Sequence, residues 1–383
     1  IASGITNSQT RFEVNYEVPL LAGRGNVFLL EGRERLNVTL RQRAEAAPLI
    51  FVIAGLGGFA TDGKALFLSE LFYNAGFHVV TLPSGFNWQF SLSGSRTGLV
   101  GNTEDDVADY YEALKKVDIS LKKQTGLKVT SYGIAGYSLG AYHSLYLNRI
   151  DEKQKVFNFK RVLMINSPVD LGYGLKLLDN YFANIKNIPP QRAATVDQRF
   201  FAVATKVKDM KDPDEVFRYL VNLERNKYFS EDEMKYIIGK QFHDSLVDII
   251  FTTQQIRDLG VLKSPLSKWN RTARMNEIGL FNFQSYFEKL VILGLKVIDN
   301  RTTTFEDLIK NSNFYALKSY IQNNDKIFLV HNSNDFLLKT GDVDFLKESF
   351  GDRAVLFPGG GHCGNFWMPQ NKAFMLKALK SGF

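Results

Sequence analysis

The stretch KVTSYGIAGYSLGAYHSLYLN, residues 128–148, contains the pentapeptide GYSLG at 136–140. A strand pattern runs up to Ser138, and a helix pattern begins directly after it. Glycines on either side of the serine remove the Cβ atoms that would collide in a tight strand-to-helix turn. The pentapeptide is common by itself, so its meaning depends on what the rest of the chain supplies.

Short apolar runs typical of buried parallel strands alternate with amphipathic helix patterns in 48–170 and again in 326–383. Residues 1–47 add strand patterns with alternating apolar positions. Between these parts, 171–325 is mostly helical in pattern. We therefore predict an α/β core with a doubly wound, mostly parallel sheet. Its first part is 1–170 and its second part is 326–383, with a helical cap or lid inserted between them.

Two more residues follow predicted strands at positions that suit acyl-transfer chemistry. Asp335 lies in LVHNSNDFLL, and His362 lies in the glycine-rich loop FPGGGHCG. A serine hydroxyl is a weak nucleophile at neutral pH and needs a base, usually a histidine that a carboxylate holds in place. The carboxyl ends of parallel strands meet at one edge of the sheet, where sites form. The order Ser138, Asp335, His362 therefore predicts a Ser-His-Asp triad at that edge.

In these three motifs the sequence resembles the α/β-hydrolase superfamily. GYSLG is similar to the nucleophile elbow of that superfamily, HNSNDFLL to its acid turn, and GGGHCG to its histidine loop. The resemblance covers about 48–170 and 326–383, and 171–325 stands where members commonly insert a cap. It implies the α/β-hydrolase fold with a large helical cap, and an activity like that of a capped serine esterase or lipase.

The resemblance also implies an oxyanion hole made of backbone N–H groups. One donor is expected from Leu139, and the other from Leu56 or Gly57 in the loop after the first buried strand. Many members carry a histidine in that loop, whereas this chain reads AGLGG at 54–58. A backbone amide survives that change, so the mechanism stays the same while the subgroup is left open.

Other residues compete for the same roles. Asp170 ends the strand after the nucleophile helix, a position that some members use for the acid, but the turn around Asp335 fits the acid loop better. His143 lies inside the helix that follows Ser138, so its ring should point away from the elbow. Cys363 would need its own base and elbow to act as a nucleophile, so we expect a buried thiol without a catalytic role.

The segment PSGFNWQFSLSGSRTGLVG, residues 83–101, reads as a long irregular connection. Long ordered loops in compact domains are often functional, which makes Phe86, Trp88 and Arg96 candidates for contact with the substrate. The aromatic residues of 171–325 either form a core of their own or line an acyl pocket under the cap.

The expected function is a carboxylic ester hydrolase, resembling an esterase, lipase or lysophospholipase, that forms an acyl-enzyme on a small-molecule or lipid-like ester with an apolar acyl group. A serine peptidase, an acyltransferase and a catalytically inactive binding module of the same fold remain as alternatives. No cofactor is expected, because the glycine runs lack the lysine and the spacing of nucleotide-binding loops. No metal is expected either, because no His, Cys and Asp residues have ligand spacing.

Charge and composition limit the classes of molecule that the protein is expected to bind. The chain has 383 residues and a net charge of +7, with lysines and arginines dispersed, which argues against nucleic acid and allows attraction to an anionic membrane surface. One cysteine excludes an intrachain disulfide, and no run of 18 apolar residues predicts a membrane span. A start at Ile1 fits either export after removal of a leader, to the periplasm or envelope, or a trimmed chain. The sequence does not indicate an oligomeric state.

Overall fold

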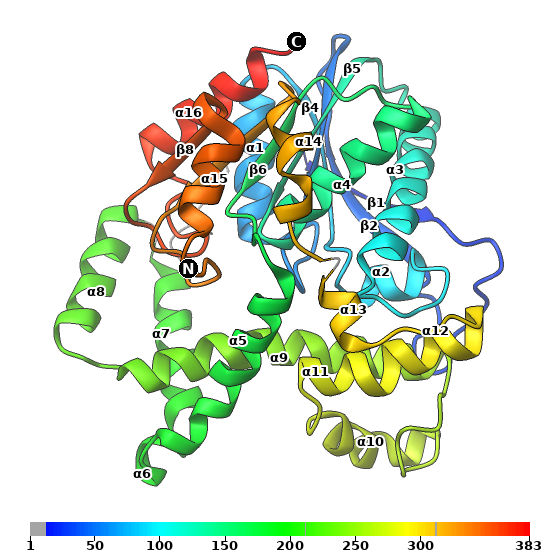
Figure 1. Ribbon diagram of the computed structural model, residues 1–383, viewed down its shortest axis with the longest axis vertical. Coiled ribbons are helices and arrows are strands. Elements are labelled where there is room, and N and C mark those ends of the chain that lie inside the picture. Colours follow the sequence, from blue (N-terminus) through cyan, green and yellow to red (C-terminus); the bar gives the residue numbers. More distant parts are fainter. Residues whose placement is uncertain (1–12, 211, 311) are drawn as a thin grey trace.

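The computed structural model describes residues 13–210, 212–310 and 312–383, and the strand pattern expected to begin within 1–12 lies partly outside them. In the described part, strands join into one mostly parallel sheet with helices on both faces (Figure 1). The strands are β1 (Glu13–Pro19), β2 (Arg35–Arg41), β3 (Ala47–Ile53), β4 (His78–Leu82), β5 (Val129–Tyr137), β6 (Val162–Ile165), β7 (Ile327–Asn332) and β8 (Ala354–Phe357).

The strand order across the sheet is β1-β2-β4-β3-β5-β6-β7-β8. The pairings β1 with β2 and β2 with β4 are antiparallel, and all pairings from β4 to β8 are parallel. Parallel strands need helical crossovers, which cover both faces of the sheet and explain why the central strands read as unbroken apolar runs. The carboxyl ends of β5, β7 and β8 therefore lie at the same edge.

Alternating side chains of β3 divide between two apolar cores. Phe51 and its i±2 neighbours pack with helices α3, α4 and α15, whereas Ile50 and Val52 pack with helices α1 and α16. Successive side chains of a strand point to opposite faces of the sheet, and both faces of β3 are buried. A shift of one residue would exchange the two sets of side chains, so this burial fixes the register of the sheet. The helices are α1 (Gly63–Asn74), α3 (Thr103–Thr125), α4 (Leu139–Gln154), α15 (Asp342–Phe350) and α16 (Pro369–Lys380).

Two expectations about local structure need correction. The strand pattern expected within 1–47 is interrupted between β1 and β2, because 20–34 forms loops and turns in which Leu29 and Gly32 have positive φ angles. The connection at 83–101 is not wholly irregular, because it contains the helix α2 (Trp88–Ser93). Asn87 caps α2, with its side-chain oxygen accepting a hydrogen bond from the Gln89 N–H at 2.8 Å.

Between β6 and β7 the described residues form helices and no strand of the sheet. We call 171–325 the helical insertion, and most of its helices lie together below the sheet in Figure 1. Its longest helix, α9, begins at a capping box in which the Ser230 and Glu233 side chains cap each other's backbone N–H groups. The elements of the insertion are α5 (Leu171–Ala183), η2 (Asn184–Asn187), α6 (Pro190–Ala193), α7 (Val196–Asp209), α8 (Pro213–Arg225), α9 (Glu231–Ile256), η3 (Lys268–Asn270), α10 (Arg271–Ile278), α11 (Phe283–Tyr286), η4 (Phe287–Val291), α12 (Ile292–Asp299), α13 (Phe305–Lys310), η5 (Tyr315–Leu317) and α14 (Lys318–Gln322).

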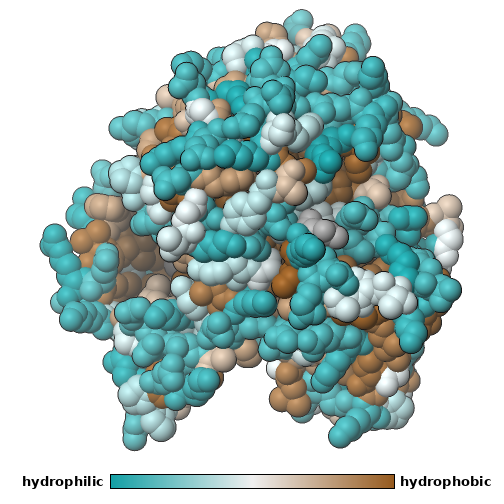
Figure 2. All heavy atoms as spheres, in the orientation of Figure 1, coloured by the Kyte–Doolittle hydropathy of each residue, from teal (hydrophilic) through white to brown (hydrophobic). Residues whose placement is uncertain are grey.

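The face of the molecule drawn in Figure 2 is mainly hydrophilic, with hydrophobic residues gathered over parts of the helical insertion. Trp269 and Leu280, both in the insertion, are 85% exposed and are the most exposed large apolar side chains among the described residues. None of the described helices combines the length and the apolar character that crossing a bilayer would require.

Two glycines allow β5, α4 and β3 to approach one another closely. A Cβ atom on Gly136 would lie 2.3 Å from the carbonyl carbon of Gly140. A Cβ atom on Gly140 would lie 2.2 Å from the carbonyl oxygen of Ile53 in β3. Backbone atoms cannot move aside as a flexible side chain can, so both positions require glycine.

We expect Gly140→Ala to lower the free energy of unfolding by about 3 kcal/mol, because the new methyl group is forced against the β3 backbone. Urea unfolding followed by circular dichroism measures the change. Gly25→Ala is the matched control, since a Cβ atom there would meet no atom within 4 Å. Equal stability of the two variants would contradict the close approach of α4 and β3.

Candidate active site

Ser138 occupies a strained turn between β5 and α4. Its backbone has φ 56° and ψ −126°, a conformation that side-chain-bearing residues rarely adopt. The Ser138 N–H donates a hydrogen bond to the Ile165 carbonyl oxygen at 2.8 Å, which ties the turn to the end of β6. Strain of this kind persists only where the surrounding structure determines it, and it is concentrated at functional sites.

The structure brings Ser138, His362 and Asp335 together at the carboxyl edge of the sheet. The His362 Nε2 atom lies 2.8 Å from Ser138 Oγ, and the His362 Nδ1 atom lies 2.8 Å from Asp335 Oδ2. An ionised carboxylate can only accept, so Nδ1 carries the proton and donates to Asp335. When the ring is neutral, Nε2 therefore has its lone pair facing the hydroxyl of Ser138.

Asp335 is held as an ionised carboxylate although it is only 3% exposed. Its Oδ1 atom accepts from the Leu337 N–H at 3.0 Å, and its Oδ2 atom accepts from Asn166 Nδ2 at 3.2 Å. Burial alone would raise the pKa of Asp335, but the His362 ring, His331 and the Leu337 N–H together outweigh burial and hold that pKa below its usual value. The carboxylate therefore stays charged at neutral pH, where it orients the ring.

Opposing effects also act on His362. Burial alone would lower the pKa of His362, whereas the neighbouring Cys363 sulfur and the Asp335 carboxylate raise it above its ordinary value. The charge on Asp335 thus stabilises an imidazolium, which is the form that a histidine takes when it has accepted a proton from serine.

An amide network, which the sequence patterns did not reveal, joins the loop of His362 to the turn of Asp335. Asn332 Nδ2 donates to the Gly361 carbonyl oxygen at 2.8 Å, and Asn365 Nδ2 donates to Asn332 Oδ1 at 2.7 Å. Asn334 Oδ1 accepts from the Gly361 N–H at 2.8 Å. The asparagines in HNSND were visible in the sequence, but their partners lie about thirty residues away, so only the fold identifies them.

The backbone around Ser138 supplies two candidate oxyanion donors. Leu139 is the first residue of α4, where N–H groups have no partner within the helix and the helix dipole is positive. Leu56 stands in the loop after β3, where no partner of its N–H is recorded among the described residues. The N–H of the alternative donor, Gly57, donates to the Phe86 carbonyl oxygen at 2.9 Å, which favours Leu56 over Gly57 as the second donor.

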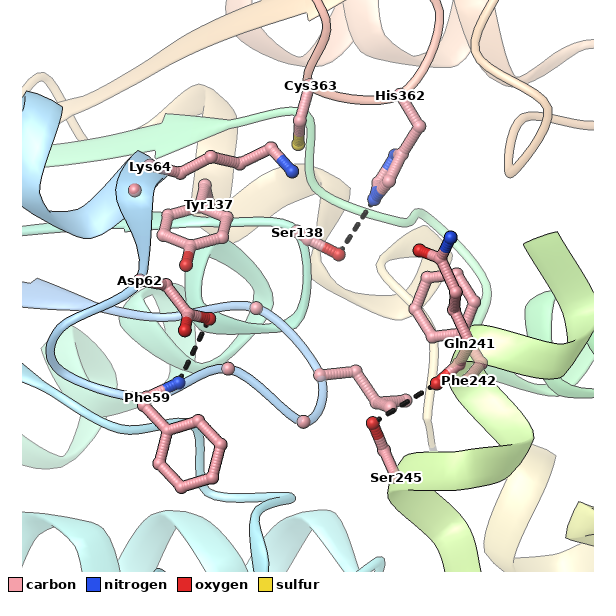
Figure 3. A pocket seen from close by; sticks show the side chains of 15 residues that line it. Phe59, Asp62, Lys64, Tyr137, Ser138, Gln241, Phe242, Ser245, His362 and Cys363 are labelled. Atoms are coloured by element: carbon pink, nitrogen blue, oxygen red, sulfur yellow. Dashed lines mark hydrogen bonds between the residues drawn. The ribbon is translucent and has the colours of Figure 1, made fainter. Parts of the chain in front are cut away.

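A cavity of about 440 Å³ opens in front of Ser138 and His362 (Figure 3). One wall is the loop after β3, and the opposite wall is α9, which the sequence patterns had not connected with the site. The two walls touch, because a Cβ atom on Gly57 would lie 2.1 Å from Ser245 Oγ. The side chains that line the cavity beside Ser138 and His362 are Leu56, Phe59, Asp62, Lys64, Tyr137, Gln241, Phe242, Ser245 and Cys363.

A second cavity, of about 50 Å³, lies beside the two candidate oxyanion donors. Leu56 lines both cavities, whereas Leu139 lines only the smaller one. Apolar side chains from α5, η4 and α13 complete most of the lining, and His143 and Asp106 add polar groups. The apolar residues contributed by these three helices are Leu171, Leu175, Phe287, Leu308 and Ile309.

The three candidates for substrate contact fall in different places. Phe86 is buried and lines the smaller cavity. Trp88 lines neither cavity, but its ring packs edge-to-face on Phe59, with ring centroids 6.4 Å apart. Arg96 lies apart from both cavities: its side chain is 64% exposed, pairs with Asp109 and lines a separate surface pocket.

The rival acid is also placed elsewhere. Asp170 caps α5 by accepting from the Tyr173 N–H at 3.0 Å, and it pairs with Lys339 Nζ at 2.6 Å. His143 points away from the Ser138 hydroxyl into the wall of the smaller cavity, and burial lowers its pKa to about 4. Within 13–210, 212–310 and 312–383, no three His, Cys, Asp or Glu side chains are grouped as metal ligands.

Comparisons with known proteins add the following findings. No protein-family model matches the chain, and no curated protein sequence is similar to it. Among solved structures, Est1E from Butyrivibrio proteoclasticus is 13% identical, with 96% of this chain and 99% of that chain covered and a TM-score of 0.42. An esterase from Pyrococcus furiosus is 11% identical, with 97% and 90% covered and a TM-score of 0.45. A proline iminopeptidase-related protein from Thermus thermophilus is 16% identical, with 97% and 98% covered and a TM-score of 0.44.

The fold follows from the chain's own topology. In the sheet, β2 runs antiparallel to its neighbours β1 and β4, and the strands from β4 to β8 are parallel. This arrangement and the strained serine between β5 and α4 are those of the α/β-hydrolase fold. This confirms the fold class expected from the sequence.

We expect Asp335→Asn to lower the pKa of His362, because removal of the carboxylate takes away the charge that stabilises the imidazolium. Nuclear magnetic resonance of the histidine side chains across a pH titration measures the shift, with His362→Gln identifying the signal. Asp170→Asn is the control and should leave the pKa of His362 in place. The opposite pattern would make Asp170 the partner of His362.

Proposed function

We propose that the protein is a serine hydrolase that cleaves carboxylic esters through an acyl-enzyme. The observation that carries this proposal is the continuous chain of hydrogen bonds from Ser138 Oγ through the His362 ring to Asp335, with both distances at 2.8 Å. Two further features support a nucleophilic role for Ser138: its strained backbone, and the nearby Leu56 N–H, for which no partner is recorded among the described residues. Both features suit a nucleophile, and neither strengthens the fold.

In the first half of the reaction, Ser138 Oγ attacks the ester carbonyl carbon while its proton passes to His362 Nε2. The carbonyl oxygen becomes an oxyanion, which the N–H groups of Leu56 and Leu139 stabilise. The C–O bond to the alcohol then breaks, and the departing oxygen takes the proton from Nε2. Asp335 stays ionised throughout and stabilises the transient imidazolium.

In the second half, water enters from the larger cavity and attacks the acyl carbon. Its proton passes to His362 Nε2, the bond from carbon to Ser138 Oγ breaks, and Oγ recovers the proton. The carboxylic acid leaves, and the enzyme returns to its starting state. No step needs a cofactor.

The two cavities suggest which part of the ester lies where. The smaller cavity is enclosed mostly by leucine, isoleucine and phenylalanine side chains, so it suits an apolar acyl chain. Its volume of about 50 Å³ corresponds to about four groups the size of water, and hence to an acyl chain of about four carbon atoms. The larger, more polar cavity is left for the alcohol.

The lining of the larger cavity favours an ester over a peptide with a free amino end. Asp62 is the only carboxylate among the described residues that line it, and its Oδ2 atom accepts from the Phe59 N–H at 3.0 Å. An aminopeptidase needs an acidic group to bind the ammonium of its substrate, whereas Lys64 places a positive charge in the same cavity, which opposes an ammonium there.

Ser138→Ala should lower kcat/KM for 4-nitrophenyl butyrate by about 10⁴-fold or more, because the nucleophile is removed. A fluorophosphonate probe should label the unmodified protein once, at Ser138, and should not label the variant. Peptide mapping by mass spectrometry identifies the labelled residue. Ser144→Ala is the control, since that hydroxyl donates to the Gly140 carbonyl oxygen inside α4. Full activity of Ser138→Ala would refute the proposed function.

Leu175→Ala should move the preferred acyl chain to a length greater by about three carbon atoms, because the smaller cavity gains the space of the three lost side-chain carbons. A series of 4-nitrophenyl esters from acetate to decanoate, compared by kcat/KM, measures the preference. Leu178→Ala is the control, since it removes the same atoms from the same helix without lining the cavity. An unchanged optimal chain length in Leu175→Ala would show that the acyl chain does not bind in this cavity.

A further inference from the structure

Lys64 places a positive charge at the mouth of the proposed active site. It lies in the first turn of α1 and lines the larger cavity with Ser138 and His362. In Figure 3 its amine extends toward the space beside Ser138 and His362. A lysine ammonium offers three donors and no acceptor, so it suits an anionic or strongly polar acceptor.

The fold itself does not account for this lysine. No carboxylate lies within 4.0 Å of the Lys64 amine among the ion pairs of the described residues. The first turn of a helix also disfavours a cation, because the helix dipole is positive there. A lysine that neither pairs nor stabilises its helix is better explained by something that binds in the cavity.

Asp62, the nearest acidic residue in the sequence, does not neutralise Lys64 by contact. Its Oδ2 atom accepts from the Phe59 N–H at 3.0 Å and thereby closes the loop that precedes α1. Burial is the main influence on Asp62 and raises its pKa, while the charge of Lys64 acts in the opposite direction and only in part offsets it. Asp62 thus serves the loop, and the amine of Lys64 remains available.

Gln241 supplies neutral donors on the facing wall. It projects from α9 into the same cavity, where its amide lies near Ser138 and His362 (Figure 3). No hydrogen bond of that amide is recorded among the described residues, although its backbone oxygen accepts from Ser245 Oγ at 3.3 Å. Both groups line the cavity that contains Ser138, so both can donate hydrogen bonds to an acidic group of a substrate bound there.

We propose that Lys64, with Gln241, binds an anionic group, a carboxylate or a phosphate, on the alcohol part of the ester. This inference rests on the proposed function, because it places the acyl chain in the smaller cavity and the alcohol in the larger one. The substrate class becomes short-chain esters of acidic alcohols, bound by their charge at one end and their acyl chain at the other. Lys64 and Gln241 hold the ester in place, and the triad performs the bond changes.

Three butyrate esters that differ in the charge of the alcohol test the proposal: 3-butyroxybenzoate, phenyl butyrate and 3-butyroxy-N,N,N-trimethylanilinium. In Lys64→Met, kcat/KM for the benzoate ester should fall about tenfold more than kcat/KM for phenyl butyrate, mainly through KM. Lys64→Glu should reverse the order and favour the trimethylanilinium ester. Comparing variants cancels the different intrinsic reactivities of the esters, and added salt should reduce the effect.

Lys123→Met is the matched control, because Lys123 is exposed in the last turn of α3 and does not line the cavity. It removes one positive charge from the molecule and should leave the ratios among the esters as in the unmodified protein. 3-Butyroxyphenyl phosphate, tested beside the benzoate, shows which anion is preferred: a larger loss in Lys64→Met for the phosphate indicates a phosphate-bearing substrate, and a larger loss for the benzoate indicates a carboxylate.

Equal losses for charged and neutral esters in Lys64→Met would overturn the role of Lys64 and leave the ester hydrolase in place. A change of the ratios in Lys123→Met as large as that in Lys64→Met would also overturn it, because the effect would then come from net charge. If the unmodified protein cleaved none of the esters and took up no fluorophosphonate, the proposed function would fail together with the inference.

Discussion

The close contact between Gly136, Gly140 and the carbonyl oxygen of Ile53 is the constraint on which the site depends. It brings β5, α4 and β3 to a distance that no side chain could tolerate, and so forces Ser138 into a backbone conformation that residues with side chains rarely adopt. The same turn directs the first N–H of α4 beside the serine hydroxyl. Packing of backbone on backbone therefore sets the position of Ser138, together with the hydrogen bond from its N–H to the Ile165 carbonyl oxygen.

A second constraint joins two loops that are distant in the sequence. The turn around Asp335 and the loop around His362 share the amides of Asn332, Asn334 and Asn365. Asn332 and Asn365 are buried and hydrogen-bonded to each other, so movement of either loop would leave a polar group unsatisfied. The ring of His362 thus receives a fixed orientation from its loop as well as from Asp335, which is the precondition for proton transfer over a short distance.

The sequence was sufficient for those parts of the fold and site that depend on local pattern. The parallel strands, the helices of the core and the residues that follow strand ends could be predicted, because hydrophobic period and glycine placement are properties of short segments. Choices that depend on long-range partners could not. Asp170 pairs with Lys339 and not with His362, and the N–H of Gly57 donates to the Phe86 carbonyl oxygen. The residues of α9 reach the site only through tertiary packing, about a hundred residues after Ser138.

The cavity wall contributed by α9 is separate in the sequence from the strand ends that carry Ser138, Asp335 and His362. Gln241, Phe242 and Ser245 follow one another on one face of a single helix, while the reacting groups stand on three separate strand ends. Substitutions on that face of α9 would change the shape of the cavity and leave Ser138, Asp335 and His362 in place. A library of variants confined to this one helix face would therefore change the wall of the cavity and leave the three strand ends unchanged.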